Sequence, residues 1–174
     1  MLSDEELFPL IDEICEKIKK EIIAANRIGD IDSVLSKYDV EKEEHYFCEP
    51  KIAKILVIGQ SDVNIVDLKR VVRKYKSLGI DEDRFEFVLE YDDAKNYPME
   101  SLRYNQKYSD IFFGPISHKT SGMGDCSSII AKIKNNPAEY PKMTELKDSN
   151  GLKITKHSFE QALLKSCLFN LIQK

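Results

Sequence analysis

Side chains that could bind or transform a ligand gather in one loop of this chain. A short apolar run, Ile111 to Phe113, leads through Gly114-Pro115 into that loop. Its polar residues and glycines are His118, Lys119, Thr120, Ser121, Gly122, Gly124, Asp125, Ser127 and Ser128. An apolar periodic segment from Ile129 follows at once. The pattern predicts a buried strand, a polar loop and the start of a helix, and we expect the loop to be the functional part of the protein.

The composition of this loop suits a small anion. Gly122 and Gly124 allow the backbone to approach a ligand closely. Ser127 or Ser128 is expected to cap the next helix, whose free N–H groups favour phosphate or carboxylate. A cation and two hydroxyl donors stand nearby: Lys119, Thr120 and Ser121. Neither a GxxxxGK[ST] nor a G-x-G-x-x-G motif is present, so a turn, a cap or tight packing remains the alternative role of the glycines.

His118 is the candidate for acid–base catalysis because the ordinary pKa of histidine lies near neutrality. Asp125 or Asp62 could orient it. The alternative is a histidine bonded to the loop backbone. Cys126 could have a lowered thiol pKa at the helix N-terminus, or it could be an inert buried cysteine.

The sequence predicts no metal site and leaves any cofactor unknown. His45 and Cys48 form an H-x-x-C pair without a second pair nearby. Asp92 and Asp93, at the end of a predicted strand, could bind a metal or a ribose, but solvated carboxylates are the commoner case.

Apolar runs and their periodicity predict the elements that position the loop. A continuous run up to Ile58 is typical of a strand covered on both faces, and it ends in Gly59-Gln60-Ser61-Asp62. Alternation over 85–91 predicts an edge strand. Further strands are expected at 109–114 and 143–146, with a possible one at 152–155. Helices are expected at 65–75, at 127–135 and from a cap at Ser158 through Ile172.

Together these elements predict an α/β fold: a three-layer, flavodoxin- or Rossmann-like, mostly parallel sheet of order 2-1-3-4 with a possible fifth strand. Ligands bind such sheets beyond the carboxyl ends of the strands, where the strand order reverses. The predicted site therefore joins two loops. Its first loop supplies Gly59, Gln60, Ser61 and Asp62, and its second runs from Gly114 to Ser128.

Residues 1–48 predict a helical arm ahead of the α/β domain at 51–174. Ser3 and Glu6 match a capping box, and Leu7, Ile11, Ile14, Ile18 and Ile22 recur along one helix face. Pro9 is expected to kink the helix or delay its start. Gly29 is expected to end it and Asp30 to begin a shorter helix. The arm could mediate self-association or bind a partner, or it could pack on its own domain.

Composition narrows the classes of partner. Residues 1–50 hold 14 acidic and 6 basic side chains, and residues 51–174 hold 16 and 20, giving a net charge of −4. We do not expect nucleic acid as a partner, although the helix at 65–75 has a basic face. No apolar run approaches the roughly 20 residues of a membrane span. Four cysteines without a CxxC motif, and no signal peptide, favour the cytoplasm.

Three short stretches resemble a group of small Rossmann-like bacterial domains of unknown function. They are Lys54–Gly59 (KILVIG), Asp110 with Ile116-Ser117-His118, and Ser158–Leu163 (SFEQAL). The resemblance covers about residues 52–165 and omits the arm. It implies a Rossmann-like fold and marks His118 as a residue of interest, but it implies no activity.

Three hypotheses follow. The first is a sensory or regulatory protein that binds a small phosphorylated or nucleotide-like ligand at the carboxyl ends of the strands. The second is a hydrolase or transferase with His118 as acid–base. The third is an interaction module that acts through its N-terminal helices.

Overall fold

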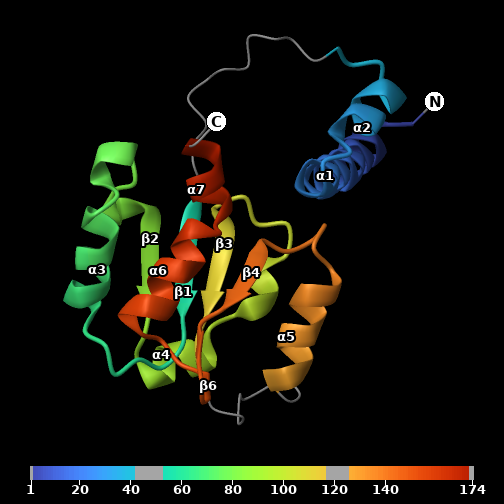
Figure 1. Cartoon of the computed structure of the whole chain (residues 1–174). Coiled ribbons are helices and arrows are strands. Elements are labelled where there is room, and N and C mark those ends of the chain that lie inside the picture. Colours follow the sequence, from blue (N-terminus) through green and yellow to red (C-terminus); the bar gives the residue numbers. More distant parts are fainter. Residues whose placement is uncertain (1, 42–52, 117–125, 173–174) are drawn as a thin grey trace.

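A parallel four-stranded sheet forms the centre of the molecule. The structure, a computed structural model, describes residues 2–41, 53–116 and 126–172. The strands of the sheet are β1 (Lys54–Ile58), β2 (Phe85–Val88), β3 (Tyr108–Phe113) and β4 (Lys142–Glu145). They pair in the order β2-β1-β3-β4, and every pairing is parallel. The predicted strand order and the central positions of the first and third strands are confirmed (Figure 1).

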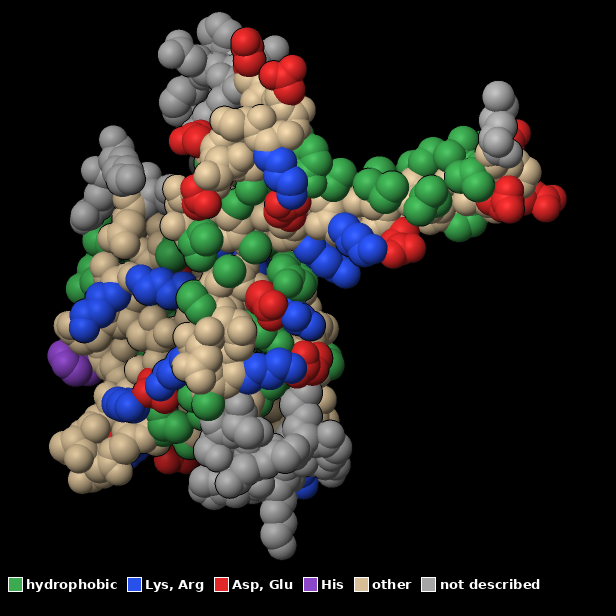
Figure 2. Space-filling view, turned by 90° about the vertical axis from the view of Figure 1, so that its right-hand side faces the viewer, with side chains coloured by type: hydrophobic (Ala, Val, Ile, Leu, Met, Phe, Trp, Pro, Cys, Tyr) green, Lys and Arg blue, Asp and Glu red, His purple; other side chains and the backbone are tan. Residues whose placement is uncertain are grey.

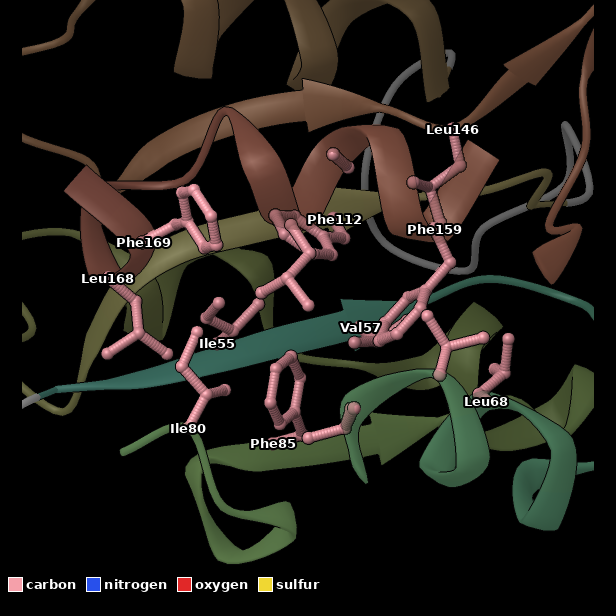
Figure 3. Close-up of a cluster of buried hydrophobic side chains, with 14 of the residues drawn as sticks. Ile55, Val57, Leu68, Ile80, Phe85, Phe112, Leu146, Phe159, Leu168 and Phe169 are labelled. Atoms are coloured by element: carbon pink, nitrogen blue, oxygen red, sulfur yellow. The ribbon is translucent and has the colours of Figure 1, made fainter. Parts of the chain in front are cut away.

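One face of the sheet is covered by α3 (Ile65–Arg73), α6 (Lys156–Leu164) and α7 (Cys167–Ile172). Side chains alternate across a strand, so Ile55 and Val57 of β1 lie on this face. Figure 3 shows the cluster between the sheet and these helices. The Phe159 ring is at its centre, 5.7 Å from the Phe85 ring and 5.8 Å from the Phe112 ring. This is the geometry in which aromatic pairs add to burial.

The opposite face is covered by α4 (Tyr91–Asn96), the 3-10 turn Met99–Leu102 and α5 (Cys126–Asn135). The alternate β1 residues, Leu56 and Ile58, are fully buried there. Both faces of β1 are thus covered, which explains its continuous apolar run. The architecture is therefore three layers, helices on either side of one sheet.

The N-terminal part is a helical hairpin of α1 (Asp4–Ile28) and α2 (Ile31–Lys37). The predicted capping box forms, with the Glu6 carboxylate accepting from the Ser3 N–H at 2.9 Å. Gly29 ends α1 in the left-handed conformation, with φ +79°. The hairpin lies beyond the amino ends of the strands, whereas the carboxyl ends point the other way (Figure 1). The division of the chain into two domains near residue 50 remains a prediction.

Several predicted boundaries are wrong. The second strand stops at Val88 instead of residue 91, because Tyr91 begins α4 and the Asp92 and Asp93 carboxylates lie in its first turn, where the helix dipole favours them. Pro9 does not delay α1, which already begins at Asp4. The Ser3–Glu6 cap satisfies groups of the first turn, so the loss of a single N–H at Pro9 is tolerated.

The C-terminal predictions also need correction. Thr155, three residues before the expected Ser158, is the N-cap of α6, and the two hydroxyls bond each other's backbone N–H. The sequence predicted a single last helix, but the structure has two. The buried Ser166 hydroxyl accepts from the Phe169 N–H and starts α7. The possible fifth strand does not join the sheet. Leu152 instead lies in β6 (Gly151–Leu152), paired only with β5 (Lys147–Asp148).

Candidate functional site

The two loops that the sequence singled out meet where β1 and β3 end. The Gln60 N–H donates to the Pro115 carbonyl at 2.7 Å, and the Gly114 N–H donates to the Ile58 carbonyl at 2.7 Å. β1 and β3 are neighbours in the sheet, and Ile58 pairs with Phe113 although the two residues are 55 positions apart in the sequence. The predicted convergence of these loops is therefore confirmed for the residues on either side of this junction.

The junction depends on two glycines. Gly59 has φ +141°, a conformation that side chains rarely adopt, and a Cβ there would lie 2.7 Å from the Gly114 backbone. A Cβ on Gly114 would lie 2.4 Å from the Ile154 side chain. Gly59 is therefore needed for the close approach of the two backbones, and Gly114 for packing against the Ile154 side chain.

Some polar side chains in and just after the first loop form hydrogen bonds with the backbone of the same segment. The Ser61 hydroxyl bonds the Val63 backbone, accepting from its N–H at 3.1 Å. The Asn64 side chain accepts from the Val66 N–H at 2.9 Å and caps α3. Gln60 and Asp62 are exposed, so their side chains are the ones of this loop that face solvent.

Most of the second loop lies outside the described residues: His118, Lys119, Thr120, Ser121, Gly122, Gly124 and Asp125. The roles predicted for them remain predictions, as does the pair His45 and Cys48. One expectation is corrected. α5 begins at Cys126, which places Ser127 and Ser128 inside its first turn, so neither is its N-cap. Among residues 2–41, 53–116 and 126–172, no group of three metal-ligating side chains comes together.

A second feature lies at the opposite, amino edge of the sheet. A cleft of about 1020 Å³ separates α1 from the starts of β3 and β4. Arg27 of α1 is one wall of it, and its guanidinium donates to the Asn105 carbonyl at 2.7 Å and to the Glu139 carbonyl. Burial lowers the pKa of Arg27. These two bonds attach α1 to the α/β layers.

Behind the cleft, one buried carboxylate organises the C-terminus. Asp110 has no exposed surface, and it accepts from the Cys167 N–H at 3.0 Å and from the Ser109 hydroxyl at 2.8 Å. It thereby satisfies the first turn of α7. Burial raises the pKa of the Cys167 thiol, and the negative charge of Asp110 raises it further by a smaller amount. The thiol is accordingly protonated and weakly nucleophilic at neutral pH.

No pattern in the sequence pointed to the cleft at the amino edge of the sheet. Arg27 belongs to no motif, and only the fold brings it beside residues 78 and 112 positions away. An acidic residue next to the apolar run 111–113 was the available signal for Asp110, since a buried carboxylate must find donors.

The basic face of α3 is paired with acids. Arg70 lies 2.8 Å from Asp67, and Lys74 lies 3.0 Å from Glu160. Arg73 bonds Glu82, which also lies 3.7 Å from Lys69. All four basic side chains between residues 65 and 75 therefore have carboxylate partners.

Comparison of the chain with protein-family models, curated proteins and solved structures gave no match. The resemblance to small Rossmann-like domains therefore remains a prediction. Within the described parts of the chain, no helix is both long and apolar enough to cross a membrane.

Proposed function

We propose that this protein is a self-associating module in which α1 pairs with α1 of a second copy. The observation that carries the proposal is an uncovered apolar stripe on the outer part of α1. Every residue from Leu2 to Lys17 is exposed. Figure 2 shows this helix projecting from the molecule with hydrophobic side chains along one side.

The stripe consists of the exposed Leu7, Ile11 and Ile14 and ends at the half-buried Ile18, and spacings of three and four residues place these side chains on one face. Leu7 is 37 % exposed and Ile14 is 46 % exposed. Scattered apolar residues are normal on a surface, but a contiguous row marks a contact. Farther along α1, the face is covered by α2, where Val34 is buried and both Lys37 and Tyr38 bond Glu21.

Charge favours a second copy in antiparallel orientation. Between residues 4 and 16, α1 carries six acidic and no basic side chains, and Lys17, Lys19 and Lys20 follow. A parallel pair would bring the acidic halves together. An antiparallel pair with Ile11 opposite Ile14 places Glu5 and Glu6 of one copy opposite Lys20 and Lys19 of the other.

The position of α2 fits the same register. With Ile11 opposite Ile14, residue 4 of the second copy lies opposite Glu21, where the C-terminal end of α2 is anchored. Helix α1 of the second copy thus ends where α2 begins to cover the apolar face of α1. Its positive N-terminal dipole then approaches the negative C-terminal dipole of α2, an arrangement that favours the contact.

Sedimentation velocity over a wide range of protein concentration tests the proposal. A contact of a few helical turns lies at the small end of specific interfaces, so we expect a dissociation constant of about 1 μM. Ile14→Asp should leave a monomer. Leu78→Asp is the matched control, since Leu78 is 45 % exposed and lies on the 3-10 turn Lys76–Leu78, and it should still dimerise. A monomeric parent, or a dimeric Ile14→Asp variant, would contradict the proposal.

Disulfide trapping tests the orientation. In a Cys15→Ser background, which is also the control, Leu7→Cys and Ile18→Cys are prepared separately and then mixed under mild oxidation. Antiparallel pairing predicts a mixed disulfide dimer that forms only in the mixture. A disulfide dimer of Leu7→Cys alone would show a parallel pair instead.

A second candidate function is binding of a small phosphorylated or nucleotide-like ligand at the carboxyl ends of the strands. What supports it is the bond from the Gln60 N–H to the Pro115 carbonyl, which joins the two loops at the reversal of strand order. A flavodoxin-like fold is part of this proposal. Thermal unfolding with nucleotides and sugar phosphates tests it, because a ligand at 100 times its dissociation constant adds about 2.7 kcal/mol.

The variants His118→Ala and Lys119→Ala should lose that stabilisation, whereas Ile14→Asp, at the other end of the molecule, should keep it. If His118→Ala binds the ligand but no longer converts it, the protein is a hydrolase or transferase. If no compound stabilises the parent, the carboxyl-edge proposal fails.

A further inference from the structure

We propose that the cleft between α1 and the amino ends of the strands binds an amphipathic anion, with a carboxylate or phosphate head group on an apolar body. This site lies at the end of the sheet opposite to Gln60 and Pro115. Its volume of about 1020 Å³ is at the upper end of the range for small-molecule sites.

All the charged residues that line the cleft are positive. Its lining includes the cations Arg27, Lys134 and Lys142 and no acidic residue, although the chain as a whole is negative. Lys134 lies 2.7 Å from the Glu145 carboxylate and is neutralised. The other two cations bond main-chain carbonyls, Lys142 donating to the Lys165 carbonyl at 2.6 Å.

Arg27 and Lys142 thus bring two positive charges to the cleft without a carboxylate partner among the described residues. The nearest buried acid, Asp110, is held by the backbone of Cys167 and the hydroxyl of Ser109. An anionic head group could therefore form charge-assisted hydrogen bonds with these cations, which are stronger than neutral ones.

The remaining lining suits an apolar body. Aliphatic side chains and prolines come from α1, α5 and the start of β4, among them Ile22, Ile23, Ile133 and Met143. Ile23 and Ile133 are buried, whereas Ile22 is 37 % exposed. An apolar wall with a few placed cations is the usual composition of a site for an amphiphile.

The experiment uses the absence of tryptophan from the chain. Ile22→Trp places a single tryptophan on the cleft wall, which is excited at a wavelength that the tyrosines do not absorb, and Leu78→Trp provides one far from the cleft. The probes are decanoate, decyl phosphate and the neutral decanol, each below the concentration at which it aggregates. The two acids should shift the emission of the Ile22→Trp protein to shorter wavelength and leave that of Leu78→Trp unchanged.

Charge reversal by Lys142→Glu in the Ile22→Trp protein should weaken binding of the acids about tenfold or more, the usual effect of losing a charged hydrogen bond. Lys76→Glu, an exposed reversal elsewhere, should not. The better of the two acids identifies the head group. Equal binding of decanol, an unchanged affinity in Lys142→Glu, or no response to either acid would overturn the proposal. Circular dichroism confirms that each variant is folded.

Discussion

Gly59→Ala probes the junction on which the carboxyl edge depends. The substitution adds one methyl group at φ +141°, where it would lie 2.7 Å from the backbone of Gly114. Gly114 cannot move freely, because it is also packed against Ile154, whose side chain would lie 2.4 Å from a Cβ on Gly114. The strands or the loop must therefore move.

The expected loss of stability follows from two contributions. Holding alanine in this backbone region costs about 1–3 kcal/mol. Separating the backbones also strains the bonds from Gln60 to Pro115 and from Gly114 to Ile58, each contributing about 1 kcal/mol. We expect a total of about 3–5 kcal/mol, a large part of the 5–15 kcal/mol typical of a folded domain.

Gly79→Ala is the matched control. Gly79 also has a positive φ, +83°, but a Cβ there would have no neighbour within 4 Å. Only the conformational strain should remain, about 1–2 kcal/mol. The difference between the two variants isolates the steric conflict at the junction.

Urea unfolding followed by far-ultraviolet circular dichroism measures both variants, since the chain has no tryptophan for fluorescence. Equal losses in Gly59→Ala and Gly79→Ala, with unchanged m-values, would refute the close approach of the two loops.

Three further outcomes are expected. Phe159→Ala removes the ring at the centre of the aromatic cluster, and it should cost about 3–5 kcal/mol in the same urea experiment. Asp110→Ala leaves the Cys167 N–H without its acceptor and should cost about 1–3 kcal/mol, with faster labelling of the Cys167 thiol by a disulfide reagent. Hydrogen bonds from Arg103 lower the pKa of Glu139 from its ordinary 4.5, so its stabilising contribution is complete above that value and is lost as the pH falls through the lower folded pKa. Thermal unfolding should therefore depend less on pH below 4.5 in Glu139→Gln than in the parent, and identical profiles would show that the pair contributes nothing.

The strands of the sheet were predictable because burial on both faces leaves a direct mark on sequence. The continuous run of β1 and the apolar run of β3 identified the two central strands, and the strand order followed from them. The break between α6 and α7 was not predictable, because the apolar period continues across it. It depends on the Ser166 hydroxyl and on Asp110, which is 57 positions from Cys167.

The candidate site shows the same division between local and distant causes. The meeting of the loops after β1 and β3 follows from topology alone, and the structure confirms it at Gln60 and Pro115. The cleft at the amino edge could not be foreseen, since its cations come from α1, α5 and β4 and no local spacing links these elements. The capping error at Ser127 arose because the helix begins at Cys126, two residues before the start that an N-cap at Ser127 would give, a difference that side-chain preference does not resolve.

The two ends of α1 explain why one helix can take part in two separate contacts. Ile23 and Arg27, near its C-terminal end, face the α/β layers, whereas Leu7, Ile11 and Ile14 are exposed along its outer turns. A helix of 25 residues is about 37 Å long, so its outer half lies well beyond the cleft. Substitution at Ile14 can therefore abolish pairing while leaving the bonds of Arg27 in place. Loss of decanoate binding in Ile14→Asp would mean that the second copy, and not the cleft alone, completes that site.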